Sequence, residues 1–105
     1  MPYNVYVIEL DPEVQREDRF LSANPDRRDD KPCVYVGSTV HTPEERLQQH
    51  LSGVHKNRYA YRYGVRLLPR LYRNLQGYET RKQAEAAEAR CAARLRRRGY
   101  GVWYG

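Results

Sequence analysis

One glutamate interrupts an otherwise apolar stripe near the end of the chain. Glu88 follows Ala84 by four residues and precedes Cys91 by three, so in a helix the three side chains share one face. A carboxylate among small apolar residues costs several kcal/mol unless a cation or a metal ion lies beside it. Three interpretations stay open for Glu88: a metal ligand, a partner in a structural salt bridge, or an exposed side chain on a helix that is rotated away from the core. Glu85 falls on the polar side, and we expect it to be solvated.

An arginine and a histidine lie together on an earlier predicted helix. Arg46 and His50 are four residues apart, so they share one helical face. That face borders the apolar stripe formed by Leu47, Leu51 and Val54. We therefore expect both side chains at the edge of the core and not far out in solvent.

Two tyrosines occupy the middle of two apolar segments. Tyr6 and Tyr35 each stand between two valines. If these segments are strands that pair antiparallel, both phenols can point to one face of the sheet. Core packing with a satisfied hydroxyl group also accounts for a tyrosine in a strand. The pattern leaves chemistry and packing open for both residues.

The strands that position these residues can be predicted from β-branched and aromatic runs. Residues 3–10 and 33–38 predict two strands, a third is expected within 69–75, and residues 100–104 could add an edge strand. The polar, proline-rich residues 11–32 predict a long inserted loop, in which Asp-Pro-Glu could start a short helix.

Capping residues predict two main helices. Thr42, followed by Pro-Glu-Glu, predicts a helix that runs to about Ser52. Thr80 starts the last helix, which Gly99 ends, and the basic residues 54–68 predict a loop with a short helix. The expected fold class is α+β, with the whole chain, 1–105, forming a single domain.

The basic residues are distributed very unevenly. The 105 residues have a net charge of +6, but residues 1–45 carry five Arg and Lys against ten Asp and Glu, whereas residues 46–98 carry fourteen against three. A positive face of this kind attracts a polyanion. Tyrosines interleave with the cations of this stretch and could stack on bases. We therefore predict a nucleic-acid-binding surface that includes Lys56, Arg58, Arg62 and Arg66.

Other classes of protein and site are disfavoured. No run approaches the ~18 apolar residues that cross a bilayer, and residues 1–4 do not resemble a secretory signal. Cys33 and Cys91 do not make a disulfide framework, and the absence of a Cys-x-x-Cys pair argues against structural zinc. We expect a cytoplasmic protein with free thiols and no membrane partner.

The order of five features along the chain resembles the GIY-YIG nuclease family. These features are Val-Tyr-Val at 5–7, Tyr-Val-Gly at 35–37, Arg46, His50 and Glu88. Residues 33–53 carry the most specific part of the resemblance. The family implies a small three-stranded antiparallel sheet flanked by helices, here with a long insertion between the first two strands. It also implies hydrolysis of DNA with one divalent metal ion, Mg²⁺ or Mn²⁺.

The resemblance also implies a role for each of the five residues. Glu88 would bind the metal ion, and Tyr35 or Tyr6 would activate the attacking water. Arg46 would hold the scissile phosphate, and His50 would lie close to it. A phenol has a pKa of ~10, so it needs a nearby cation to act as a base at neutral pH.

The chain departs from the family pattern at three points. The first triplet, residues 4–6, lacks the family's glycine, and 29 positions separate the two motif tyrosines, far more than usual. The insertion is therefore a candidate partner-binding or substrate-selecting element. Gly101 stands near the end, where many members carry an asparagine, which Asn57 or Asn74 could replace.

Three functions follow in order of support. The leading hypothesis is a divalent-metal-dependent DNA endonuclease. The second is a catalytically idle nucleic-acid-binding module on the same fold. The third is a protein-interaction module in which the acidic residues 11–32 dock a basic partner or a second copy of the chain.

Overall fold

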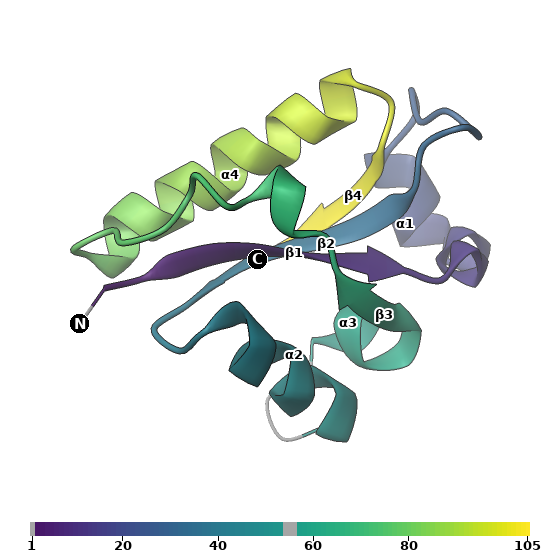
Figure 1. Ribbon diagram of the computed structural model, residues 1–105. Helices are drawn as coiled ribbons and strands as arrows, with labels where there is room; N and C mark the ends of the chain where they lie inside the picture. The colour runs from purple at the N-terminus through teal and green to yellow at the C-terminus, as the bar shows by residue number, and fades with distance from the viewer. Residues whose placement is uncertain (1, 54–56) are drawn as a thin grey trace.

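A four-stranded mixed sheet lies at the centre of the computed structural model, which describes residues 2–53 and 57–105 (Figure 1). Its strands, in the spatial order β3-β1-β2-β4, are β1 (Asn4–Leu10), β2 (Cys33–Thr39), β3 (Gly64–Leu67) and β4 (Gly101–Tyr104). β1 runs antiparallel to β2 and β3, whereas β4 runs parallel to β2. The α+β class is confirmed. β1, β2 and β3 form the predicted antiparallel arrangement, and the edge strand suggested for residues 100–104 is present as β4, so the sheet has four strands and is mixed instead of three-stranded and antiparallel.

The third strand lies earlier in the chain than predicted. The backbone N–H of Leu68, just after β3, still donates a hydrogen bond to the carbonyl of Val7 in β1, at 2.9 Å. Pro69 has no N–H to continue this ladder, and it begins a 3-10 helix, η2 (Pro69–Leu71). The strand expected within 69–75 is therefore absent from that segment.

The predicted helix starts are confirmed. The helices after β2 are α2 (Pro43–Ser52), α3 (Arg58–Tyr63) and α4 (Arg81–Arg97). The Thr42 hydroxyl accepts a hydrogen bond from the Glu45 N–H at 3.1 Å, and Thr80 with Gln83 forms a capping box on α4. Gly53 ends α2 with a φ of 80°, a left-handed conformation that a glycine adopts without strain.

Residues 11–32 are not the long loop that was predicted, whereas the short helix expected to start at Asp11-Pro12-Glu13 is confirmed. They form η1 (Pro12–Arg16) and α1 (Asp18–Ala23), and the side chains of Val14 and Phe20 are fully buried. The buried Asn24 amide accepts a hydrogen bond from the Val102 N–H at 2.8 Å and donates one to its carbonyl at 3.0 Å. This side chain pairs with backbone groups of the edge strand β4, together with Arg96, whose Nη2 also donates to the Val102 carbonyl at 2.9 Å.

The helices cover both sides of the sheet. Figure 1 shows α4 on one side, with α2 and α3 on the other. No helix in the described part of the chain is long and apolar enough to cross a membrane. β4 pairs with β2 only as far as Val36, so the end of β2, residues 37–39, has no strand neighbour on that edge within the described ladder. The sheet is therefore open there, between α2 and α4.

Candidate active site

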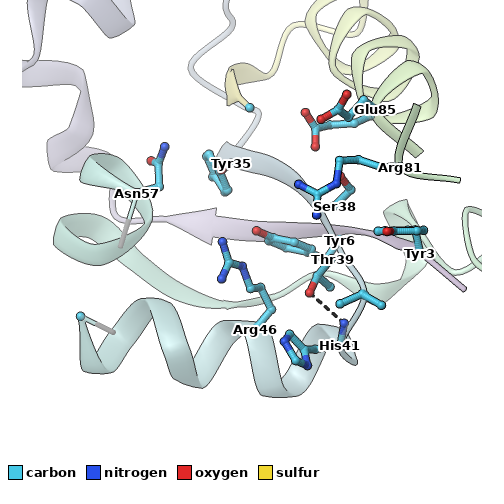
Figure 2. A pocket seen from close by; sticks show the side chains of 14 residues that line it. Tyr3, Tyr6, Tyr35, Ser38, Thr39, His41, Arg46, Asn57, Arg81 and Glu85 are labelled. Carbon is cyan, nitrogen blue, oxygen red and sulfur yellow. Dashed lines mark hydrogen bonds between the residues drawn. The ribbon is translucent and has the colours of Figure 1, made fainter. Parts of the chain in front are cut away.

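A cleft of about 940 Å³ opens at this uncovered end of β2 (Figure 2). Figure 2 shows Arg46 entering from α2, with Arg81 and Glu85 entering from α4 on the opposite side. The residues that line the cleft are Tyr3, Tyr6, Tyr35, Ser38, Thr39, Val40, His41, Arg46, Gly53, Asn57, Arg81, Glu85, Glu88 and Gly105. Four of the five predicted catalytic and metal-binding residues are among them.

The antiparallel pairing of β1 and β2 brings the two tyrosines together. Tyr6 lies opposite Gly37, and Tyr35 is two residues before Gly37, so the two rings are diagonal neighbours on one face. Their centroids are 6.2 Å apart. A Cβ at position 37 would collide with the Tyr6 phenol, so only glycine leaves room for the ring. The expectation that both phenols share a face is confirmed.

His50 lies behind Tyr6 and does not line the cleft. Its side chain is fully buried, and its Nε2 is 2.9 Å from the Tyr6 hydroxyl. The backbone N–H of Asn57 can only donate, so His50 Nδ1, at 3.4 Å, accepts. The hydrogen of the neutral ring is then on Nε2 and is donated to the Tyr6 oxygen. His50 thus acts on the cleft through Tyr6.

Arg46 reaches the cleft with an unsatisfied donor. Its Nη1 donates to the Gln49 side chain at 3.1 Å, while its buried Nε has no hydrogen-bond partner in the described part of the chain. A buried guanidinium N–H without an acceptor is costly. An anionic oxygen in the cleft would satisfy it, and a guanidinium is shaped to bind phosphate.

The two tyrosines have different electrostatic surroundings. Burial raises the pKa of both phenols. For Tyr6, the adjacent Arg46 guanidinium offsets part of this rise. For Tyr35, the negative charges of ionised Tyr6 and Glu88 raise the pKa further and outweigh the effect of Arg46. Tyr6 is therefore the phenol with the better-stabilised ionised form.

Glu88 is a buried carboxylate that faces the cleft. It is only 7% exposed, and burial, followed by the charge of Glu85, raises its pKa to about 6, although the Ser38 hydroxyl works in the opposite direction. No described Arg or Lys forms an ion pair with it. The structure thus provides no salt bridge to account for Glu88. Glu85 is exposed as predicted, but it also lines the cleft (Figure 2).

These carboxylates fit a magnesium-type site and not a zinc-type site. Residues 2–53 and 57–105 contain no group of three or more His, Cys, Asp or Glu side chains that could hold a metal ion. Mg²⁺ does not need such a group, because it keeps several waters and binds through one or two carboxylates and substrate phosphates. Glu88, with Glu85 one turn away, meets that requirement. Cys33 and Cys91 are free and buried.

Sequence reasoning missed several residues of the cleft. Asn57 lines it and caps α3, whereas Asn74 lies elsewhere, so of the two suggested asparagines only Asn57 is placed at the site. Tyr3 lines the cleft beside Arg81, whose guanidinium lies over the Tyr3 ring at 5.8 Å. The four-residue spacing of Arg81 and Glu85 was a signal that could have found both.

The predicted nucleic-acid-binding residues do not line the cleft. Arg58 and Arg62 pair with Glu17 at 2.8 and 3.3 Å, and Arg66 pairs with Glu9 at 2.6 Å. Lys56 is outside the described residues. The sequence from 54 to 75 contains no Asp or Glu, but folding brings Glu9 and Glu17 next to its arginines. The predicted role of these arginines stays a prediction.

Comparison with known proteins agrees with the geometry of the cleft. The model of the GIY-YIG catalytic domain matches residues 3–101, which is nearly the whole chain. No curated protein and no solved structure matched the chain. The order of the motif residues, their convergence on one cleft and this match establish that the chain belongs to the GIY-YIG catalytic domain family.

Proposed function

We propose that this protein is an endonuclease that hydrolyses phosphodiester bonds in DNA with one divalent metal ion, Mg²⁺ or Mn²⁺. Members of the family generally hydrolyse nucleic acids and depend on a divalent metal. The observation that carries the proposal is the meeting of unsatisfied charges of opposite sign in one cleft. The Arg46 guanidinium needs an anionic acceptor, and the Glu88 carboxylate needs a cation.

Arg46, whose guanidinium lines the cleft, would bind a non-bridging oxygen of the scissile phosphate. This contact strengthens as negative charge develops on the phosphate, so it favours the transition state over the ground state. Glu88, with help from Glu85, would hold the metal ion. When bound, the ion supplies a positive charge that polarises phosphate oxygens and lowers the pKa of bound water.

Tyr6 is the phenol that we assign to the proton of the attacking water. Only the phenolate can accept a proton, and two groups stabilise that form here. Arg46 contributes a positive charge, and His50 donates its Nε2–H at 2.9 Å. Tyr35 would orient the water or the phosphate as a neutral phenol. Tyr6→Phe is therefore expected to lose more activity than Tyr35→Phe, and the loss should be in kcat.

The protein-interaction alternative rests on the acidic residues 11–32. Four of the seven acidic side chains there form ion pairs with arginines of the chain, namely Glu13, Glu17, Asp29 and Asp30. Glu17 in particular pairs with two arginines. The catalytically idle nucleic-acid-binding module remains the alternative, and only an activity assay separates it from the nuclease.

The test is cleavage of labelled single-stranded, duplex and branched DNA by the purified protein, with Mg²⁺, with Mn²⁺ or with a chelator. We expect metal-dependent products that Glu88→Gln and Arg46→Ala abolish or strongly reduce. Glu79→Gln and Arg90→Ala, exposed residues outside the cleft, are matched controls that should cut normally. Binding without cleavage under all metal conditions would favour the idle module.

A further inference from the structure

Four arginines line one small pocket away from the cleft. The pocket has a volume of about 200 Å³ and lies between α4 and the segment that follows β3. We call it the arginine pocket, and its four arginines are Arg70, Arg73, Arg94 and Arg98. Asn74 lines it too, and no aspartate or glutamate is among its described lining residues.

The core holds the two segments that carry these arginines against each other. Tyr72, between the first two, is buried, and the thiol of Cys91 in α4 lies 4.0 Å from the Leu71 carbonyl. These contacts fix the backbone around Arg70 and Arg73 against α4. Folding itself therefore places four arginines around one pocket.

None of the four forms an ion pair with a described residue. Arg94 Nη2 donates to the Cys91 sulfur at 3.9 Å, and the other three side chains have no hydrogen bond within residues 2–53 and 57–105. Like charges at close range disfavour the folded state, and an anion between them would remove that repulsion. Guanidinium groups bind phosphate oxygens through paired hydrogen bonds.

The arginine pocket and the cleft lie on opposite edges of α4. At 3.6 residues per turn, Glu85 and Glu88 fall on one side of the buried stripe that contains Cys91, and Arg94 and Arg98 fall on the other. Glu88 and Arg98 are ten residues apart, which is about 15 Å along the helix axis at 1.5 Å per residue. Phosphates of one duplex strand are spaced by about 3.4 Å along the axis. The axial separation of about 15 Å thus corresponds to about four nucleotides of one strand.

We propose that the arginine pocket is an exosite for the phosphate backbone of the nucleic-acid substrate, at a distance from the scissile phosphate. The ligand class rests on the proposed function, because the family hydrolyses nucleic acids. The exosite supplies affinity and register but touches no reacting atom. It replaces the arginines of α3 and β3 as the main backbone-binding surface, since Arg58 and Arg62 are already paired with Glu17, and Arg66 with Glu9.

The experiment measures binding of labelled duplex DNA by fluorescence anisotropy across a salt titration, with a chelator present so that no cleavage occurs. Each phosphate contact contributes a log–log salt slope of roughly −0.9 for duplex DNA. Arg73→Ala/Arg98→Ala should make the slope shallower by about 1 to 2 and weaken affinity at low salt roughly tenfold. The matched control, Arg58→Ala/Arg62→Ala, removes the same formal charge but should change the slope by much less.

Equal effects of the two double variants, or no effect of Arg73→Ala/Arg98→Ala, would overturn the exosite. Duplex RNA and vesicles of anionic lipid are the other arms. If Arg73→Ala/Arg98→Ala loses vesicle binding but keeps nucleic-acid binding, the pocket binds a membrane surface, and the proposal is overturned. Wild-type protein that binds but never cuts would contradict the proposed nuclease activity alone, because the salt slopes do not depend on cleavage.

Discussion

Glu17 and Glu88 are two carboxylates in opposite electrostatic environments. Glu17 accepts hydrogen bonds from the Tyr63 hydroxyl at 2.7 Å and from Arg58 and Arg62, and these groups hold its pKa below the usual value. Glu88 has no ion-pair partner among the described residues, and burial raises its pKa to about 6. The region around Glu17 is internally balanced, whereas the cleft holds separated charges of both signs.

The difference separates charges that stabilise the fold from charges that await a ligand. A buried charge without a partner lowers stability, so a fold that keeps one has a use for it elsewhere. Glu88 and the Arg46 Nε meet this description in the cleft. The arginine pocket also holds charges without a described partner, but it lies at the surface, where solvent screens their repulsion and the cost to stability is smaller. The ion pairs around Glu17 do not.

The largest effect that follows is from Glu88→Gln, which should abolish cleavage, since an amide cannot supply the charge that a divalent cation needs. Calorimetry should show a Mg²⁺ or Mn²⁺ site in the wild type and none in the variant. Glu17→Gln is the control within the comparison, because it changes a paired carboxylate and should cut at a normal rate under saturating substrate. Full activity of Glu88→Gln would break the distinction between the two regions.

Arg46→Ala should lower kcat by about 100- to 1000-fold, the usual cost of removing one donor from a developing oxyanion. Substrate affinity should stay within a few-fold, because the wider basic surface supplies it. Arg62→Ala removes an arginine that is already paired, and its kcat should be unchanged. A loss of affinity in Arg46→Ala with normal kcat would mean that this residue only binds.

Much of the fold was predictable because its signals are local. Thr42 and Thr80 start helices through capping patterns within four residues, and both starts are confirmed. The failures depend on distant partners. Phe20 and Val14 are isolated apolar residues in a polar stretch, so no periodicity marks residues 11–32 as core. The orientation of β4 depends on where α4 returns the chain, which propensity does not encode.

The site was predictable where residue type alone is informative. Glu88 was identified because a carboxylate on an apolar stripe is unusual, and His50 because it borders the core. Charge counting along the chain treats Arg58, Arg62 and Arg66 as unpaired cations. It could not show that the folded chain brings Glu17 and Glu9 into ion pairs with these arginines. Pairing is a property of tertiary structure, so net charge in a sequence window overstates the free positive surface.

The stability of the protein should report the unpaired charge of Glu88. Its pKa is raised from the ordinary 4.5 to about 6, so the carboxyl contributes stability below about pH 4.5 that is lost as pH rises through about 6. The difference corresponds to about 2 kcal/mol. Glu88→Gln should therefore raise Tm by several degrees at pH 7.5 and by little at pH 4. Thermal melts without divalent metal test this, and an equal shift at both pH values would contradict it.

Glu17→Gln should convert the balanced region into a second binding surface. Without the carboxylate, Arg58 and Arg62 lose their partner and become available to phosphate. We expect affinity for duplex DNA to rise several-fold at low salt, with a steeper salt slope. Glu13→Gln removes the same charge from a single exposed pair with Arg16 and is the matched control. An equal gain in both variants would show that net charge, and not pairing, sets the affinity.

The smallest effect concerns the repulsion within the arginine pocket. Arg73→Gln removes one exposed cation from a group of four that has no described acidic partner, so the free energy of unfolding should rise by a few tenths of a kcal/mol. Salt screens exposed charges over about 10 Å at 0.1 M and about 3 Å at 1 M, so the gain should vanish at high ionic strength. Arg62→Gln removes a paired cation and should show no gain at any salt concentration. Denaturant melts at two ionic strengths check this difference. A gain in Arg73→Gln that persists at high salt would have a cause other than charge, and the contrast between paired and unpaired arginines would then not apply to stability.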